Sequence, residues 1–391
     1  MSLVPHSLLL SCSDDVSFSV ADSSLQHLHT LCALLERVSA LKPAATLRIA
    51  LLPSIALEQT CASLLLRPTA LQPSACAPIP QPLVWAGKRT RVLLAYCSSM
   101  EKALALPNIR ALFIPSVSEY LGEVATREQQ VSLVSKLLQP MPRAQLFPPL
   151  SWQELTCRKE AVYATFTDKF MLHTEWIALP DKQSLPVVAE KIREHCGRSG
   201  KWVLKGNFSA CSQAVFSATF SANQRCAELL STLDDLFFAY HQRCVGVQRY
   251  QQSLRDHEMR VYLIPDEQHH LRWRQTVSLS TAAYSDDGCC HFAEGSTFKA
   301  EMQLPLHGKP LRIARFIDRL LAERADFFLR AEQLRVPLLR LDCGFNEQDQ
   351  PFLNELVCAV NCCCYSGVHS QDLAYVVGQG LAEGMMTAMQ A

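Results

Sequence analysis

Hydrophobic residues in the first 145 positions fall into short runs separated by amphipathic segments. The short apolar runs predict strands over Ser7–Ser11, Thr46–Leu52, Arg91–Tyr96 and Ile109–Pro115. Leucines at helical spacing predict helices over Leu25–Val38 and Arg127–Leu138. Five prolines between Leu66 and Pro82 predict a loop. Strands that alternate with helices are typical of an α/β layer, which we expect for residues 1–145.

The pattern changes near Leu146, where predicted strands follow one another more closely. Apolar or alternating runs predict strands over Trp202–Lys205, Ala214–Phe220, Val245–Tyr250, Met259–Ile264, Leu271–Ser280, Leu338–Phe345 and Pro351–Val357. Helices are predicted over Ala222–His241 and Leu311–Arg330, and the second has a clear apolar face. Ser151 and Glu154 have the spacing of a capping box that would begin a further helix. We expect a second region of α/β (α+β in its details) structure over residues 146–391.

Charge and composition narrow the function classes. The chain has 391 residues, its 37 Lys and Arg balance 37 Asp and Glu, and 49% of its residues are hydrophobic. This length suggests two or three domains, and the balanced composition excludes a disordered chain. Zero net charge argues against a nucleic-acid partner, because nucleic-acid-binding domains are usually basic. No apolar run approaches the roughly 18–20 residues that span a bilayer, so we expect no membrane partner.

The 17 cysteines are scattered rather than spaced as a zinc or disulfide framework, and no Cys-x-x-Cys occurs. Cys358 and Cys362–Cys364 form a cluster near His369. This cluster is either a soft-metal or redox site, or a group of small residues that fill space, and the sequence leaves both open. The N-terminal residues lack a basic region before their short apolar run, which favours a buried first strand over a secretory signal. We expect a cytoplasmic chain with reduced thiols.

The most informative segment is the predicted hairpin near the C-terminus. Asp342 lies on its first strand, and Glu355 lies on the second, beside Asn354. A hairpin register can bring the two carboxylates side by side. Two carboxylates and an amide oxygen suit Mg²⁺, which takes oxygen ligands and keeps substrate phosphates. An ordinary hairpin with solvated acids is the alternative.

Two further segments carry candidate chemistry. Lys205 ends an apolar strand before a loop of small residues, where it could meet a phosphate or simply close the strand at the surface. The strand over residues 247–250 could bind an adenine edge through its backbone, and Glu258 could take ribose hydroxyls. Arg272 and Arg274 alternate onto one face of a strand, which suits phosphate or a solvated sheet face.

The order of these features resembles the ATP-grasp superfamily. Trp202-Val-Leu-Lys resembles the family's strand that ends in a lysine, and Arg340-Leu-Asp with Leu353-Asn-Glu-Leu resembles its metal-binding hairpin. Lys159 before Trp176 resembles the first nucleotide lysine, on a helix that precedes a P-T-W-x-x-L-like strand. The resemblance covers residue 146 to the C-terminus, and the region before it would be the α/β pre-ATP-grasp domain.

The resemblance implies ATP and Mg²⁺ as cofactors and a carboxylate–amine ligase that acts through an acyl-phosphate. Position by position, it implies phosphate contacts from Lys159 and Lys205, an adenine hinge at Gln248, Arg249 and Tyr250, ribose binding at Glu258, phosphoryl stabilisation by Arg272 or Arg274, and Mg²⁺ ligands at Asp342 and Glu355. The partners would be ATP and an unknown small-molecule or peptide carboxylate and amine.

The sequence departs from the family pattern at three places. Val357 stands where the family usually has a further metal ligand, the phosphate-covering loop has only Gly206, and Gln248 stands where the hinge often carries a carboxylate. Two other functions therefore stay open. One is a degenerate ATP-grasp protein that binds nucleotide and serves as an interaction or assembly factor. The other is phosphotransfer to a hydroxyl.

Overall fold

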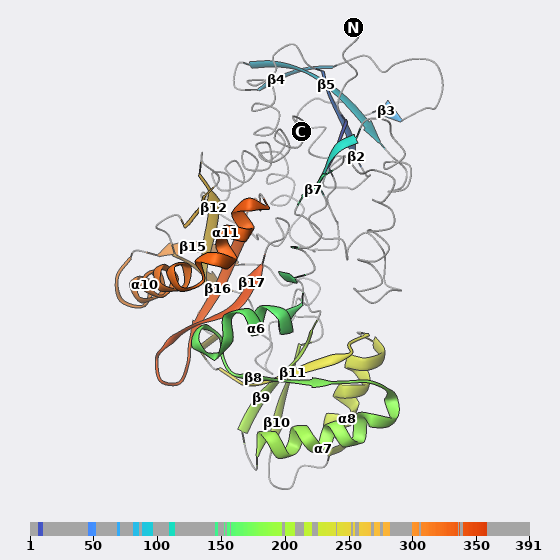
Figure 1. Ribbon diagram of the computed structural model, residues 1–391, viewed down its shortest axis with the longest axis vertical. Coiled ribbons are helices and arrows are strands. Elements are labelled where there is room, and N and C mark those ends of the chain that lie inside the picture. Colours follow the sequence, from blue (N-terminus) through green and yellow to red (C-terminus); the bar gives the residue numbers. More distant parts are fainter. Residues whose placement is uncertain are drawn as a thin grey trace.

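The computed structural model contains three β-sheets, which lie one after another along the long axis of the molecule (Figure 1). In the first 150 residues it describes the backbone of seven strands. Beyond them it describes residues 152, 155–156, 158–197, 200–207, 215–220, 226–239, 241–251, 253–254, 258–266, 270–273, 277–281, 299–304, 306–334, 336 and 339–357. None of the described helices is long and apolar enough to cross a membrane.

The N-terminal sheet has the strand order β3-β5-β2-β1-β6-β7, with β4 beside β5. Its strands are β1 (Ser7–Leu10), β2 (Thr46–Leu51), β3 (Thr69–Ala70), β4 (Gln81–Trp85), β5 (Lys88–Tyr96), β6 (Ile109–Phe113) and β7 (Gln145–Phe147). All pairings are parallel except that of β4 with β5. The four strands predicted here are confirmed, and so is the α/β class, since parallel neighbours need crossover connections.

The predicted loop between Leu66 and Pro82 is not wholly irregular, because β3 lies within it and β4 begins at its end. Both strands pair with β5, which provides hydrogen-bond partners for their backbone groups. This long-range pairing could not be predicted from the proline-rich local sequence. The predicted helices Leu25–Val38 and Arg127–Leu138 and the Ser151–Glu154 capping box lie outside the described residues.

The second sheet is antiparallel, with the order β10-β9-β11-β8. Its strands are β8 (Thr174–Ala178), β9 (Gly200–Gly206), β10 (Val215–Phe220) and β11 (Cys244–Arg249). Alternate side chains point to opposite faces. Helices α7 (Leu185–Cys196) and α8 (Cys226–Asp234) lie on one side of this sheet, as Figure 1 shows. The apolar residues of that face pack against them. The other face carries Lys205 and Gln248.

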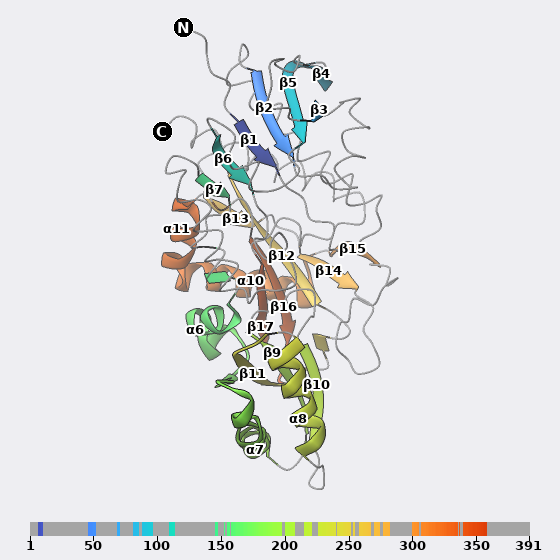
Figure 2. The ribbon, with the colours of Figure 1, turned by 90° about the vertical axis from the view of Figure 1, so that its right-hand side faces the viewer.

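The third sheet has the order β15-β14-β12-β16-β17, with β13 beside β12. Its strands are β12 (Glu258–Pro265), β13 (Leu271–Trp273), β14 (Val277–Thr281), β15 (Lys299–Leu304), β16 (Leu339–Phe345) and β17 (Pro351–Val357). Three helices pack on it: α6 (Lys159–Phe170), α10 (Gly308–Glu323) and α11 (Ala325–Gln333). Figure 2 shows this sheet between the other two. Its core joins Phe166, Phe316 and Phe327 from the helices to Leu341 and Leu353 from the strands.

Three predicted elements of this half are divided in the structure. Leu271–Ser280 is two strands, β13 and β14, which pair with opposite ends of β12. Leu311–Arg330 is two helices, because Arg324 leaves the helical conformation at φ −120° and ψ 33°. Ala222–His241 becomes α8 followed by a π-helical turn over Asp235–Ala239. The final hairpin and the strands around Lys205 are confirmed.

Candidate functional site

Asn207 fixes the start of α6 to the end of β9. Its backbone oxygen accepts from the Lys159 amide at 3.0 Å, and its side-chain Oδ1 accepts from the Glu160 amide at 2.9 Å. These contacts satisfy two N–H groups that a helix leaves unpaired in its first turn. A Cβ on Gly206 would lie only 2.7 Å from Cδ of Gln242, so the Gln242 side chain would have to move to admit a larger residue. Lys159 is therefore held at a defined place beside the end of β9.

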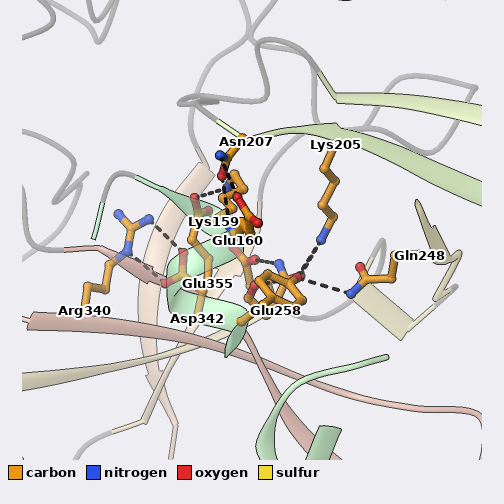
Figure 3. A network of polar contacts seen from close by, with 11 residues as sticks. Lys159, Glu160, Lys205, Asn207, Gln248, Glu258, Arg340, Asp342 and Glu355 are labelled. Carbon is orange, nitrogen blue, oxygen red and sulfur yellow. Dashed lines mark hydrogen bonds and ion pairs between the residues drawn. The ribbon is translucent and has the colours of Figure 1, made fainter. Parts of the chain in front are cut away.

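Lys159 pairs with Glu355 of β17 across the gap between helix and hairpin (Figure 3). Lysine Nζ lies 2.5 Å from Oε1, and the lysine side chain is 15% exposed. Burial alone would lower the pKa of Lys159, but the Glu355 carboxylate brings it above its usual value. Burial alone would raise the pKa of Glu355, but Lys159 holds it below its usual range. Both groups are therefore charged at neutral pH.

Asp342 lies directly opposite Glu355 in the β16–β17 register, beside a β-bulge. The expectation that the hairpin brings the two carboxylates together is confirmed. Asp342 is buried, and Arg340 donates to both its oxygens, at 2.8 Å from Nε and 2.7 Å from Nη2. The buried Arg260 on β12 places its Nε 3.6 Å from the same carboxylate. A buried carboxylate needs such compensation, because an unpaired buried charge is very costly.

Glu258, at the start of β12, is the third carboxylate of the cluster. Glu258, Asp342 and Glu355 together form what we call the acidic side of the site. One Glu258 carboxylate oxygen accepts from Asn354 Nδ2 at 3.2 Å, and the other lies 3.5 Å from Arg260. Burial and the neighbouring Asp342 raise the pKa of Glu258 to about 7. Glu258 therefore carries only a partial negative charge at neutral pH.

Tyr163, one helical turn after Lys159 on α6, lies where the two sheets approach each other. Its hydroxyl lies 3.3 Å from Nζ of Lys205, 3.2 Å from Nε2 of Gln248 and 3.4 Å from the backbone oxygen of Asn354. Its ring stacks edge-on against Trp176, with 5.7 Å between ring centroids. A single side chain thus contacts groups from β9, β11 and β17.

The structure brings six of the residues that the sequence singled out into one cluster: Lys159, Lys205, Gln248, Glu258, Asp342 and Glu355 (Figure 3). Arg249 alternates to the other face of β11 and lies 3.4 Å from Glu347. Tyr250 follows the strand, and its ring lies 4.1 Å from Nζ of Lys201. The side chains of Arg249 and Tyr250 are therefore not part of the cluster, and a hinge there would use their backbone.

Arg272 is not brought to the cluster. It lies opposite Ile264 in the β12–β13 register, and six residues of β12, roughly 20 Å at 3.3–3.4 Å per residue, separate that position from Glu258. Its side chain is exposed and pairs with Asp266 at 3.4 Å. Arg274 lies outside the described residues. A strand alternation shows which residues share a face, but not where along its partner the strand pairs.

The sequence did not single out Tyr163, Arg260 and Arg340 as site residues. Arg260 follows Glu258 by two residues and Arg340 precedes Asp342 by two, so each shares a strand face with its acid. That spacing was a usable signal for both arginines. Tyr163 offered only the four-residue spacing from Lys159, which points to a shared helix face once α6 is known.

Three described cysteines, Cys196, Cys244 and Cys343, have free thiols. Burial raises the pKa of Cys196 to about 12 and that of Cys244 to about 11, so neither is a thiolate at neutral pH. The cluster of Cys358 and Cys362–Cys364 lies outside the described residues.

The acids fit Mg²⁺ only together with a nucleotide. Among the described residues, no group of three or more His, Cys, Asp or Glu could hold a metal ion. Val357 ends β17 opposite Arg340, where it offers no ligand. Mg²⁺, however, commonly binds through one or two carboxylates plus substrate phosphates rather than in an all-protein cage. Asp342 and Glu355 supply that smaller set.

Comparisons with known proteins reveal the fold. No family model and no curated protein sequence matches the chain. Among solved structures, D-alanyl-alanine synthetase A from Vibrio cholerae superposes with a TM-score of 0.59 at 13% identity, over 100% of both chains. The D-alanine-D-alanine ligase from Coxiella burnetii gives 0.52 at 8% identity, over 99% of this chain and 95% of that one.

A third structure is the biotin carboxylase domain of the 2-oxoglutarate carboxylase from Hydrogenobacter thermophilus, solved with MgADP and bicarbonate. It gives a TM-score of 0.53 at 9% identity, over 96% of this chain and 69% of that one. These proteins have the ATP-grasp fold, so the fold expected from the sequence is confirmed.

Proposed function

We propose that the chain binds ATP with Mg²⁺ between its second and third sheets and uses it to join a carboxylate to an amine. One observation carries this proposal: two lysines and three carboxylates from separate elements converge with Gln248 where the sheets meet (Figure 3). Lys159 comes from α6, Lys205 from β9, and the acids from β12, β16 and β17. Structural neighbours named as synthetases, ligases and carboxylases support the same class of reaction.

The residues divide by charge. Lys159 and Lys205 would bind ATP phosphates, and Lys159 would exchange Glu355 for phosphate when nucleotide enters. Asp342 and Glu355 would hold Mg²⁺, which neutralises phosphate charge when bound. Gln248 would face the base, and Glu258 the ribose. Positioning and charge neutralisation account for most catalysis in phosphoryl transfer, so a site of this composition suits the reaction.

The proposed chemistry has two steps. A carboxylate oxygen of the first substrate attacks the γ-phosphorus of ATP, which forms an acyl-phosphate and releases ADP. The amine of the second substrate then attacks the acyl carbon, which forms an amide and releases phosphate and a proton. Arg340 and Arg260 lie at the buried end of the acidic side, where they hold Asp342 in place.

Nucleotide binding with little turnover is the second candidate. Two observations favour it: Arg340 occupies both oxygens of Asp342, and Val357 offers no metal ligand. An assembly factor of this kind would bind ATP and release no product.

Hydroxamate formation tests the ligase proposal without knowledge of the amine. Hydroxylamine replaces the amine in reactions of ATP, Mg²⁺ and a panel of small and peptide carboxylates, and ADP and hydroxamate are measured. We expect both products with at least one carboxylate, with loss in Lys205→Met and retention in Lys191→Met, which changes an exposed lysine on α7. ATP binding without product across a broad panel would favour the second candidate.

A further inference from the structure

The hydroxyl of Tyr163 uses its full hydrogen-bonding capacity. A phenol has one hydrogen to donate and two acceptor positions. Lys205 Nζ can only donate, and the Asn354 backbone oxygen can only accept, so the directions of these two bonds are fixed. The Tyr163 hydrogen therefore goes to Asn354, and the side chain of Gln248 must present a donor to Tyr163, as its Nε2 does at 3.2 Å.

Thr174 imposes the same orientation on Gln248 from the neighbouring strand. The Thr174 hydroxyl donates its one hydrogen to the Leu172 backbone oxygen at 3.1 Å, so it can only accept from Gln248, whose Nε2 lies at 2.9 Å. Both hydrogens of the Gln248 amide are thus committed to protein partners. Its two hydrogen bonds to described residues both use Nε2, which leaves the carbonyl Oε1 available to a ligand.

We propose that Tyr163 is a positioning residue that aligns Lys205 and, together with Thr174, locks Gln248 with its carbonyl oxygen toward the nucleotide base. This inference rests on the proposed ATP site. This fixed orientation of the Gln248 amide determines which nucleotide base binds. Oε1 accepts a hydrogen bond from an exocyclic amine and is mismatched with a carbonyl at the same place on a base. Adenine carries an amine at its position 6, whereas hypoxanthine carries a carbonyl there.

Packing around the Tyr163 ring holds its hydroxyl in one position. Its ring is buried against Trp176, and Trp176 lies over Gly246, where a Cβ would come within 2.9 Å of the indole. Gly246 lies opposite both Trp176 and Lys205 in the strand registers. The hydroxyl is thus held by packing of the ring rather than by its hydrogen bonds alone.

Calorimetric titrations of ATP and inosine triphosphate against the full chain, with Mg²⁺ present, test the inference. We expect wild type to bind ATP about tenfold or more tightly than inosine triphosphate. Tyr163→Phe keeps the ring and removes the hydroxyl, so it should raise the Kd for ATP about 3- to 10-fold and bring the ratio of the two Kd values toward one. Thr174→Val should reduce the ratio in part, and Thr174→Ser, which keeps the hydroxyl, should restore it.

The titrations distinguish failure of the ATP site from failure of the Tyr163 role. If wild type binds neither nucleotide, the proposed function fails and the inference fails with it. If wild type binds ATP but does not distinguish it from inosine triphosphate, or if Tyr163→Phe leaves the ratio unchanged while ATP still binds, the inference is overturned and the ATP site stands. Near-ultraviolet circular dichroism of Tyr163→Phe reports whether the packing on Trp176 is retained.

Discussion

The two sheets that meet at the site differ in how their polar groups are paired. On the second sheet, Lys205 contacts a hydroxyl and an amide oxygen at 3.3 Å, and both partners are uncharged. On the third sheet, Asp342 is buried and held by two bonds from Arg340. Asp342 is therefore fixed by charged partners within the fold, whereas Lys205 has only weaker, uncharged partners that a phosphate can replace.

The largest effect should follow from breaking the acidic side. Asp342→Asn leaves Arg340 and Arg260 without the buried carboxylate that compensates them. We expect a loss of about 3–5 kcal/mol in the free energy of unfolding, measured by urea denaturation. The control Asp349→Asn removes an exposed carboxylate that pairs with Arg312, and its stability should be unchanged. Equal stability of both variants would contradict the contrast between the sheets.

A second test uses pH on the same side. The pKa of Glu258 is raised to about 7 from near 4.5, so ionisation of Glu258 lowers the free energy of unfolding of the protein. This cost is absent below pH 4.5, grows as pH rises to 7 and is constant above. The free energy of unfolding of Glu258→Gln should therefore exceed that of wild type at pH 8 by on the order of 2–3 kcal/mol. The difference should vanish near pH 4.5. A variant that is less stable at pH 8 would exclude this reading of the site.

A third change tests the packing beside Lys205 on the second sheet. Gly246→Ala places a methyl group against Trp176, with contacts as short as 2.9 Å. We expect a loss of about 1–3 kcal/mol from overpacking and a change in tryptophan fluorescence as the indole shifts. Val187→Ala, on the exposed surface of α7, serves as the control and should alter neither. If Gly246→Ala changes neither the free energy of unfolding nor the fluorescence, Trp176 is not packed tightly against this face of the second sheet.

The smallest effect should come from Arg272. It lies on β13 and pairs with Asp266, and β13 meets β12 far from the acids. Arg272→Ala should change the Kd for ATP by less than about twofold, because an exposed distant charge is largely screened. A tenfold loss in a calorimetric titration would return Arg272 to the site and require a different path for β13.

The sequence predicted the fold where its signals were local. The strand that ends at Lys205 and the hairpin that pairs Asp342 with Glu355 were found because strand periodicity and hairpin register are short-range properties. Arg272 lies away from the cluster, and the sequence could not show this because its position depends on where β13 pairs along β12. Tyr163 was missed because its contacts come from β9, β11 and β17, and only the assembled sheets bring these strands together.

The most direct test of the ATP site is a calorimetric titration of Mg²⁺ with and without a non-hydrolysable ATP analogue, on wild type, Glu355→Ala and the exposed control Glu347→Ala. Two carboxylates alone are too few for Mg²⁺, so the account predicts no binding of Mg²⁺ by itself and clear binding with nucleotide. Glu355→Ala should lose this dependence, and Glu347→Ala should keep it. Nucleotide binding that ignores both Mg²⁺ and Glu355 would contradict the account.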